Sequence, residues 1–473
     1  MFILRSLLKN TIARSATEII NRLGAAVFWV LVARQLGAAA LGALAFGLSL
    51  HAFFLTISTL GLGAVVIRDV ARDRSKAPAY FGHTLILGFV CAVLAAGLMI
   101  GVTLLLQPNP ESIFASVVMA VAVIPASGFY WSKSLLSAAE DMSKIAVARL
   151  GENSFKILVG IVALLWGAGI AEIAVIVAIS KAMPAVIAYP YARRYAKPIW
   201  RLSRTTSRYL LRMIPSFSLI SVFNSLFWAA PVVILTHVSG EYQAGLFSAA
   251  YKLVDVTVSF AHAYGGALFP IASRTLKSNV ELFKSLFVKS IKYMLMMTLA
   301  MAAVLSVLSR QVILLVYGAD MLNAAPVLQL LAWMIVPFSL VPVLAFSLVS
   351  HDLQRRDLLA NLSATLVVVS TGILFSFLWG ALGTALSIVL GCFAFFLVEY
   401  VSVQRHMFAF SVLPHIWKPA LGVLLMSGVL YVFQDVPIFL NLALGGLSYL
   451  FYLMLSKAIT KHELLMVKQL RSA

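Results

Sequence analysis

The chain has 473 residues, of which 62% are hydrophobic and only 11% are charged, whereas an ordinary soluble domain carries roughly 25% charged residues. This composition excludes a soluble protein and indicates an integral membrane protein. In a soluble chain the formal net charge of +19 would indicate nucleic-acid binding, but in a membrane protein its meaning depends on where the cations lie.

Fourteen apolar runs along the chain are long enough to cross the hydrocarbon of a bilayer, which takes a helix of about twenty residues. In chain order they cover residues 12–33, 40–66, 82–106, 113–132, 147–166, 170–190, 213–236, 243–270, 288–308, 325–349, 359–378, 381–402, 418–434 and 437–456. Strands in lipid would need alternating polarity and barrel closure, and these continuous runs do not alternate. The sequence therefore predicts an all-α integral membrane protein with about 14 transmembrane helices.

Lysine and arginine fall mostly on one side of this topology. All but six of the 36 lie in the terminal segments, in the even-numbered connections or within the first five residues of the spans that follow them, on the same side as the N-terminus. The opposite side holds only Arg34 and Arg310. This asymmetry follows the positive-inside rule and predicts a multi-pass protein with both termini in the cytoplasm. It also accounts for most of the net charge without nucleic acid as a partner.

The chain contains an internal repeat. At an offset of 203 residues, Asn21 aligns with Asn224, Leu23 with Leu226, Gly37 with Gly240 and Gly42 with Gly245. Near the end of each half, Gly160 and Trp166-Gly167-Ala168 align with Gly372 and Trp379-Gly380-Ala381. Ordered matches at nearly one period indicate duplication. We predict two parallel six-helix lobes related by a pseudo-two-fold axis, at residues 1–206 and 207–416, and two extra helices with a cytoplasmic tail at residues 417–473.

The duplicated core and three short motifs resemble one family of transporters. The motifs are Arg34-Gln-Leu-Gly-Ala-Ala-Ala-Leu-Gly42, the turn from Gly240 to Gly245 that leads to Ala249-Ala-Tyr-Lys252, and Val316-Tyr-Gly-Ala-Asp320. They are similar to those of Wzx-type oligosaccharide flippases. These flippases belong to the polysaccharide transporter family of the multidrug/oligosaccharidyl-lipid/polysaccharide exporter superfamily.

The resemblance implies a flippase that moves undecaprenyl-pyrophosphate-linked oligosaccharide repeat units across the bacterial inner membrane, for O-antigen, capsule or exopolysaccharide synthesis. It implies a secondary transporter rather than an enzyme and no cofactor. The implied partners are membrane lipids, the lipid-linked oligosaccharide, a polysaccharide polymerase and a chain-length regulator. A lipid II flippase and an ion-coupled multidrug exporter of the same superfamily stay open as alternatives. An intramembrane glycosyltransferase or polymerase is disfavoured because its catalytic acid or base would usually stand in a large extramembrane loop, and no predicted loop on the outer side exceeds about twenty residues.

Four cations, Arg22, Lys156, Lys181 and Lys252, lie deep within the predicted spans, near the midplane of the membrane at about 1.5 Å per residue. A charge at mid-membrane costs roughly 2.5–3.5 kcal/mol on insertion scales, so it usually faces a protein interior or a water-filled cavity. We predict that these cations line a cleft between the lobes and bind an anionic substrate such as a pyrophosphate.

Local ion pairing is the alternative, because an acid lies three or four residues from three of these cations. The pairs are Glu18 with Arg22, Glu152 with Lys156, and Lys252 with Asp255. Such spacing places both side chains on one helix face. Pairing of this kind would lower the insertion cost without any ligand.

Four further residues are candidates for the site. Asn21 and Asn224, matched by the repeat, are predicted to hydrogen-bond across the interface of the halves, with ordinary helix packing as the alternative. Asp255 and Glu18 are the candidates for proton coupling, since a carboxyl group in a weakly solvated cavity can exchange a proton during transport. No metal site is predicted.

Overall fold

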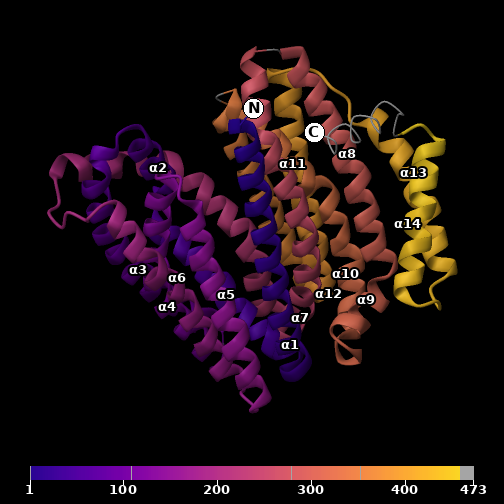
Figure 1. The fold of residues 1–473 in the computed structure, drawn as a ribbon. Helices are drawn as coiled ribbons and strands as arrows, with labels where there is room; N and C mark the ends of the chain where they lie inside the picture. Colours follow the sequence, from indigo (N-terminus) through magenta and orange to yellow (C-terminus); the bar gives the residue numbers. More distant parts are fainter. Residues whose placement is uncertain (1, 108, 279, 352, 459–473) are drawn as a thin grey trace. The chain divides into compact units, whose positions relative to one another are not determined.

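The structure is a computed structural model that describes residues 2–107, 109–278, 280–351 and 353–458, without the side chains of residues 2–23, 215–217 and 260–280. All regular elements of the described chain are helices (Figure 1). Its α-helices are α1 Phe2–Thr59, α2 Gly63–Arg72, α3 Ala77–Leu106, α4 Pro110–Ala138, α5 Met142–Leu165, α6 Ile170–Tyr195, α7 Arg204–Ser278, α8 Val280–Val307, α9 Ser309–Val316, α10 Ala325–Leu331, α11 Ile335–Ser350, α12 Gln354–His406, α13 Leu413–Val432 and α14 Ile438–Leu455. The prediction of an all-α multi-pass membrane protein is confirmed.

Ten helical stretches of the described chain are long and apolar enough to cross a membrane. Three of them contain a glycine with non-helical backbone angles, Gly37 in α1, Gly240 in α7 and Gly380 in α12. Each of these three stretches therefore holds two of the predicted spans. Helix α5 is not among the ten, because it carries several charged residues. The number of actual crossings, fourteen, stays a prediction.

Two predicted spans differ in detail from the helices observed. The second, 40–66, runs past the end of α1 at Thr59, where Leu60 and Gly61 adopt positive φ angles of 52° and 65° and turn the chain into α2. The tenth, 325–349, is divided into α10, a 3₁₀ turn at Ala332–Met334 and α11. Hydropathy is continuous across both places, so it does not detect these changes in backbone conformation.

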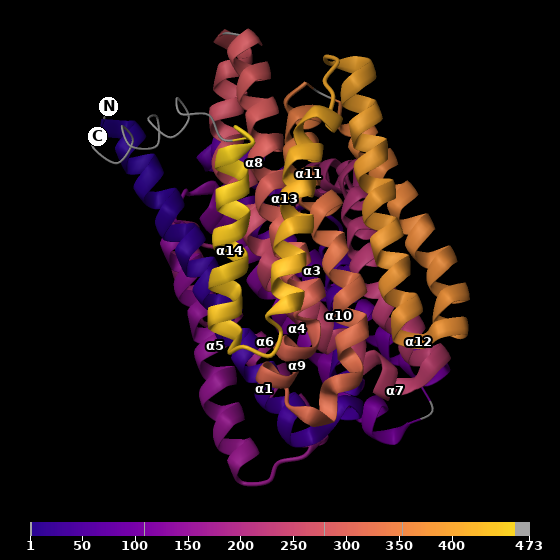
Figure 2. The same ribbon diagram turned by 90° about the vertical axis from the view of Figure 1, so that its right-hand side faces the viewer.

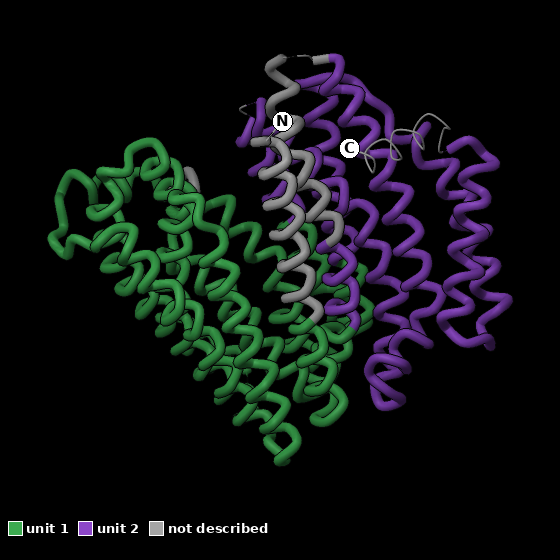
Figure 3. The backbone as a smooth tube through the Cα atoms, in the orientation of Figure 1, with its two compact units in different colours: residues 1–249, 365–387 green, residues 250–364, 388–473 purple. Residues whose placement is uncertain are grey.

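The chain forms two compact units (Figure 3). Unit 1 comprises residues 1–249 and 365–387, and unit 2 comprises residues 250–364 and 388–473. Helices α7 and α12 thus each contribute to both units. The lobe boundaries drawn from the repeat, 1–206 and 207–416, stay a prediction.

Helix α4 is central to the packing of unit 1, where it contacts α1, α3 and α6, while α5 packs against α6. Its buried face is rich in small residues, among them Ala115, Ser116 and Ala120. Small side chains let helix backbones approach closely in a membrane, where hydrophobic burial drives helices together only weakly. This packing fixes α5 and α6 side by side, which matters for the candidate site.

Two glycines matched by the repeat adopt the same unusual backbone conformation. Gly37 has φ 83° and ψ −178°, and Gly240 has φ 84° and ψ 173°. Positive φ is readily accessible only to glycine. The same residue therefore breaks the helix in the same way at equivalent points of α1 and α7.

The turns that follow these two breaks pack against each other backbone to backbone within unit 1. A Cβ atom on Gly42 would lie 1.9 Å from the carbonyl oxygen of Glu241, and one on Gly245 would lie 1.8 Å from the carbonyl oxygen of Ala38. Gly42 aligns with Gly245, and Ala38 with Glu241, at the offset of the repeat. The two contacts are therefore equivalent, and we call them together the glycine contact.

Polar bonds surround the glycine contact. The carboxylate of Glu241 accepts hydrogen bonds from Asn109 Nδ2, at 2.7 Å, and from the hydroxyl group of Ser112. His237 Nδ1 donates to the carbonyl oxygen of Leu106 at 2.8 Å. These bonds connect the first turn of α4 and the end of α3 to the broken region of α7.

At the start of α7, a polar cluster fastens this helix to α2 and α3. Asp69 accepts hydrogen bonds from Arg68 Nε at 2.8 Å, Tyr209 Oη at 2.9 Å and Tyr80 Oη at 3.1 Å. Burial alone would raise the pKa of Asp69, but the hydrogen bonds from Arg68 and Tyr209 and the charge of Arg68 lower it below its ordinary value. We call Arg68, Asp69, Tyr80 and Tyr209 the linker cluster.

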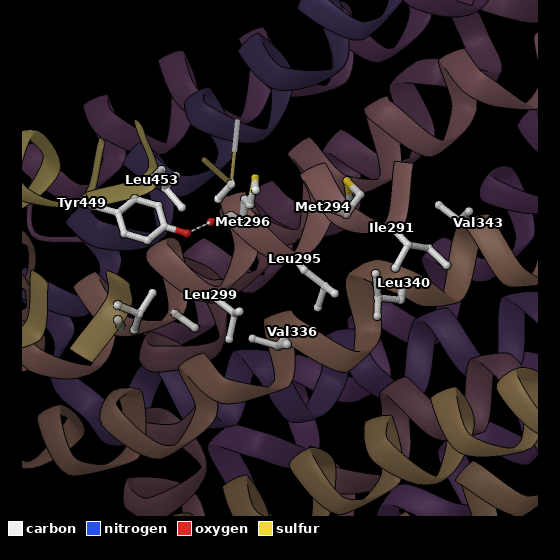
Figure 4. Packing of buried hydrophobic residues seen from close by; sticks show 14 of the residues in the cluster. Ile291, Met294, Leu295, Met296, Leu299, Val336, Leu340, Val343, Tyr449 and Leu453 are labelled. Carbon is white, nitrogen blue, oxygen red and sulfur yellow. Dashed lines mark hydrogen bonds between the residues drawn. The ribbon is translucent and has the colours of Figure 1, made fainter. Parts of the chain in front are cut away.

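In unit 2, α8 packs against α11 and α13, and α13 packs against α14. Helices α13 and α14 run side by side in opposite directions (Figure 2). The buried Oη of Tyr449 donates a hydrogen bond to the carbonyl oxygen of Met296 at 2.8 Å (Figure 4). The C-terminal helix pair is therefore attached to α8 by an apolar core with a polar bond inside it.

Candidate functional site

Helix α5 places three charged side chains on one face. Arg149, Glu152 and Lys156 are separated by three and four residues, a spacing that puts them on successive turns of the same side. Glu152 and Lys156 are only 4% and 5% exposed. Charges so deeply buried need partners, since an isolated buried charge is strongly destabilising.

Glu152 finds these partners on two helices. Lys181 Nζ, on α6, donates to Glu152 Oε1 at 2.6 Å, and Arg149 Nη1 donates to Glu152 Oε2 at 3.0 Å. Each carboxylate oxygen thus accepts a bond from a different cation. This arrangement ties α5 to α6 and holds the two cations at a fixed separation.

Lys156 lies one turn further along α5 and is held differently. Its Nζ donates to Asn153 Oδ1 at 3.0 Å and lies 5.9 Å from the centre of the Phe28 ring. The ring of Phe28 can approach because Gly160 has no side chain, since a Cβ there would lie 2.3 Å from Phe28 Cε2. The charge of Lys156 also acts on Glu152.

Arg149, Lys156 and Lys181 therefore surround the single carboxylate of Glu152, and we call these four residues the basic cluster. Three cations around one anion keep a positive charge. Side chains of Lys181 and Arg149 are 25% and 46% exposed, so their remaining N–H groups can reach a ligand. The buried His51, whose Nδ1 donates to the carbonyl oxygen of Met119 at 2.9 Å, lies within electrostatic range of Lys181.

The structure brings together two of the four predicted cations, Lys156 and Lys181. The sequence offers Lys181 no acid on its own helix, and the structure supplies one from α5. Spacing alone pairs Glu152 with Lys156, yet its carboxylate accepts from Lys181 and Arg149 instead. Contacts between helices thus determine the pairing.

The other predicted site residues are placed outside this cluster or outside the described part. Lys252 and Asp255 lie half-buried on the part of α7 that belongs to unit 2, and Asn224 is exposed on the part that belongs to unit 1. The side chains of Glu18, Asn21 and Arg22 lie outside the described residues. Their predicted roles stay predictions.

The sequence does not predict the partners or the burial of three charged residues, Arg149, Glu241 and Glu399. Arg149 lies at the start of the predicted span 147–166 and so resembles the charges that set topology, although its spacing of three residues from Glu152 is a usable signal. Glu241 is bound by Asn109 and Ser112, which lie far away in the sequence. Glu399 is completely buried in unit 2. Nothing in its apolar sequence neighbourhood marks its partner.

Fold and cluster together define a class of protein: an all-α, multi-pass membrane protein with a positively charged cluster inside a helix bundle. Residues 7–276 match the family of polysaccharide biosynthesis proteins, which is more than half of the chain. The chain belongs to that family, and the membership predicted from its motifs is confirmed. No curated protein matches the chain in sequence.

Several solved structures share the fold. The lipid II flippase MurJ in its inward closed conformation gives a TM-score of 0.78 at 14% identity, over 93% of this chain and 98% of that one. An inward-facing multidrug resistance MATE family transporter of the MOP superfamily gives 0.70 at 17% identity, over 81% and 94%. MATE in a bent conformation gives 0.60 at 17% identity, over 87% and 97%. The chain therefore shares the fold of these structures.

Proposed function

We propose that the chain is a flippase that moves undecaprenyl-pyrophosphate-linked oligosaccharide repeat units across the bacterial inner membrane. Two lobes, residues 1–206 and 207–416, alternately open to the two sides, and residues 417–473 are appended to them. The pyrophosphate and the glycan cross between the lobes while the polyprenyl tail stays in lipid. The termini and the even-numbered connections lie in the cytoplasm.

The basic cluster is the observation that carries this proposal. Lys181 lies about 16 Å from the start of α6 at 1.5 Å per residue, near the middle of the helix. A partly exposed lysine at that depth is costly against lipid and is accommodated by a water-filled path. Arg149 and Lys181 retain donors suited to phosphate oxygens, and bonds between ionised groups are about twice as strong as neutral ones.

The glycine contact supports the two-lobe mechanism. It joins a turn of each repeat, and both turns lie on the side opposite the termini in the proposed topology. Two equivalent contacts related by the repeat are what a pseudo-two-fold axis between the lobes requires. In the proposed cycle, this contact closes the outer side and separates when the cleft opens outward.

Deletion of the gene in the native host tests the function directly. We expect the surface polysaccharide to be lost and a lipid-linked oligosaccharide to accumulate on the inner side of the membrane, where mass spectrometry of extracted lipids identifies it. Unchanged surface polysaccharide, together with increased sensitivity to drugs, would contradict the proposal and favour an exporter of cationic drugs.

A lipid II flippase is the second candidate, favoured by the likeness to the MurJ fold over nearly the whole chain. Its substrate also carries a pyrophosphate, so the basic cluster fits both substrates. The deletion strain separates the two functions. Accumulated lipid II with cell lysis identifies this second function, whereas an accumulated repeat unit in intact cells identifies the first.

A further inference from the structure

Unit 2 contains a pair of carboxyl groups that neither the basic cluster nor the glycine contact uses. Asp357 lies in the first turn of α12, and Glu399 lies seven residues before the end of that helix at His406. Gly380, with φ 55° and ψ −129°, interrupts the helix between them. The two carboxyl groups lie close enough to interact directly.

Glu399 has no exposed surface, and neither of its carboxyl oxygens has a hydrogen-bond partner at ordinary geometry among the described residues. The polar groups near it on α12 are engaged elsewhere. Ser402 Oγ donates to the carbonyl oxygen of Val398 at 2.7 Å, and Tyr400 Oη donates to that of Phe410 at 3.1 Å. Glu399 is thus a buried acid without an ordinary hydrogen-bond partner, and the group that interacts with it is another acid, Asp357.

The wider surroundings of Glu399 contain charged groups on several elements, but among the described residues Asp357 alone acts on its carboxyl group electrostatically. Charged or titratable groups on the helices of unit 2 include Lys284, Lys289 and Lys292 on α8, His351 after α11, His415 and Lys418 on α13, and Arg355, Arg356, Arg405 and His406 near the ends of α12. Arg356 is bound to His406 at 3.1 Å. No cation compensates the acid pair within this described set.

Two adjacent carboxylates in such a place repel each other strongly when both are ionised, because burial removes the water that would solvate their charges. A single proton shared between them removes the repulsion and satisfies an orphaned oxygen. Asn361 Nδ2, which donates to the backbone oxygen of Asp357 at 2.9 Å and to its Oδ1 at 3.3 Å, orients the second acid for this role.

We propose that Asp357 and Glu399 form a proton-binding site in unit 2. The proton is held on one carboxyl oxygen, leaves to water when its O–H bond breaks, and is replaced from the side on which α12 begins and ends. Counting 1.5 Å per residue, Glu399 lies about 10 Å inside that end of the helix, a distance that a short water chain spans. Coupling this proton to movement of the lobes rests on the proposed function, whereas its binding does not.

Infrared spectroscopy of the purified full-length protein tests proton binding without any substrate. We expect the wild type to show the C=O stretch of a protonated carboxyl group at acid pH and to lose it at alkaline pH. The Glu399→Gln variant keeps the shape of the side chain and should lack this titrating band. Asp357→Asn removes the neighbouring acid and should move the midpoint of the titration. Glu111→Gln, at an exposed carboxyl group on α4, is the matched control and should keep the wild-type band.

Three results would overturn the site: a wild-type band that does not change with pH, an unchanged titration in Glu399→Gln, or a band that responds to sodium ions but not to pH. If Glu399→Gln is not recovered as folded protein, the midpoint of the carboxyl titration in Asp357→Asn becomes the test of the site. A midpoint equal to that of the wild type then contradicts the proposal. None of these outcomes depends on the identity of the transported lipid, which the deletion strain tests separately.

Discussion

Glu152 binds cations from two helices and thereby positions their positive charges within unit 1. Its oxygens hold Lys181 and Arg149 at 2.6 Å and 3.0 Å. Neither cation donates all of its N–H groups to this carboxylate, since a lysine has three N–H groups and an arginine has five. The acid therefore positions the cations and leaves them able to bind an anion.

Replacing Lys181 with Ala should lower export of the lipid-linked oligosaccharide about tenfold or more, because one hydrogen bond between charged groups contributes roughly 1.5–3 kcal/mol. Surface polysaccharide per cell measures export, and the amount of protein in the membrane confirms folding. Lys181→Arg keeps a positive charge and should retain most activity.

Lys76→Ala is the matched control for Lys181→Ala. Lys76 ends the short 3₁₀ turn Arg74–Lys76 between α2 and α3, and its side chain forms an exposed ion pair with Asp73 at 3.5 Å, so its removal should leave export unchanged. An equal loss of export in both lysine variants would show that the effect comes from general charge and not from the basic cluster.

The double variant Arg22→Ala, Lys252→Ala tests the two remaining midplane cations. If Arg22 and Lys252 line the path of the anionic substrate together with the basic cluster, export should be abolished while the protein is still inserted in the membrane. Normal polymer output from this variant would contradict their part in the cationic cleft. The basic cluster would then remain as the only proposed anion site.

Midplane cations could be found from sequence because their cost in lipid is independent of the fold. Their partners could not, since Lys181 and Glu152 are 29 residues apart and meet only when α5 packs on α6. The same reason hid Glu241, whose donors come from α4, and the contact of Glu399 with Asp357. Spacing within a helix predicts only neighbours on that helix.

At the scale of elements, the breaks within the long helices carry the most specific information. Hydropathy and the repeat identified the spans and the equivalence of Gly37 with Gly240, because a helix-breaking glycine is visible in sequence. The short connection after α1, with positive φ at Leu60, and the 3₁₀ turn before α11 were not visible. They depend on tertiary packing rather than on hydropathy.

Gly245→Ala should weaken the glycine contact. The added Cβ would meet the carbonyl oxygen of Ala38 at 1.8 Å, and a backbone atom cannot move aside as a side chain does. Overpacking of this kind typically costs 1–3 kcal/mol. We expect lower thermal stability of the purified protein, followed by size-exclusion chromatography after heating, and reduced export.

Gly97→Ala on α3 is the control for this prediction, because a Cβ at Gly97 would meet nothing within 4 Å. Its stability and export should equal those of the wild type. If Gly245→Ala behaves in the same way, the close approach of the two turns does not contribute to closure.

The linker cluster makes a prediction about pH. The pKa of Asp69 is lowered in the folded state, so its contribution to stability is present above the ordinary aspartate pKa of about 4 and is lost as the pH falls through the lowered value. Asp69→Asn should lower stability by about 1 kcal/mol at neutral pH. The difference between variant and wild type should shrink below about pH 4.

Limited digestion with trypsin locates this effect. Asp69→Asn should speed cleavage at Arg204 and Arg208 about fivefold at neutral pH, because α7 is held less firmly to α2. Tyr209→Phe removes one of the donors to Asp69 and should have a similar but smaller effect. A wild-type cleavage rate in both variants would argue against attachment of α7 through Asp69.

At the scale of the whole molecule, the charge asymmetry predicts the orientation of the chain. A green fluorescent protein fused after Ala473 should fluoresce, and alkaline phosphatase fused after Asp435 should be active, because the proposed topology puts the first in the cytoplasm and the second outside. The opposite pattern would invert the topology and place the glycine contact on the cytoplasmic side.

The glycine contact also has a consequence for how the molecule came to be asymmetric. In this contact Gly42 meets Glu241, and Gly245, the repeat equivalent of Gly42, meets Ala38, the repeat equivalent of Glu241. Such reciprocal contacts are those of a homodimer with two-fold symmetry, in which one surface fits a copy of itself. In a homodimer every substitution appears twice. Fusion of the two copies into one chain removes that restriction, so that each half can change independently. The glycine contact shows such a difference: Glu241 carries a carboxylate bound by Asn109 and Ser112, whereas its repeat equivalent is Ala38.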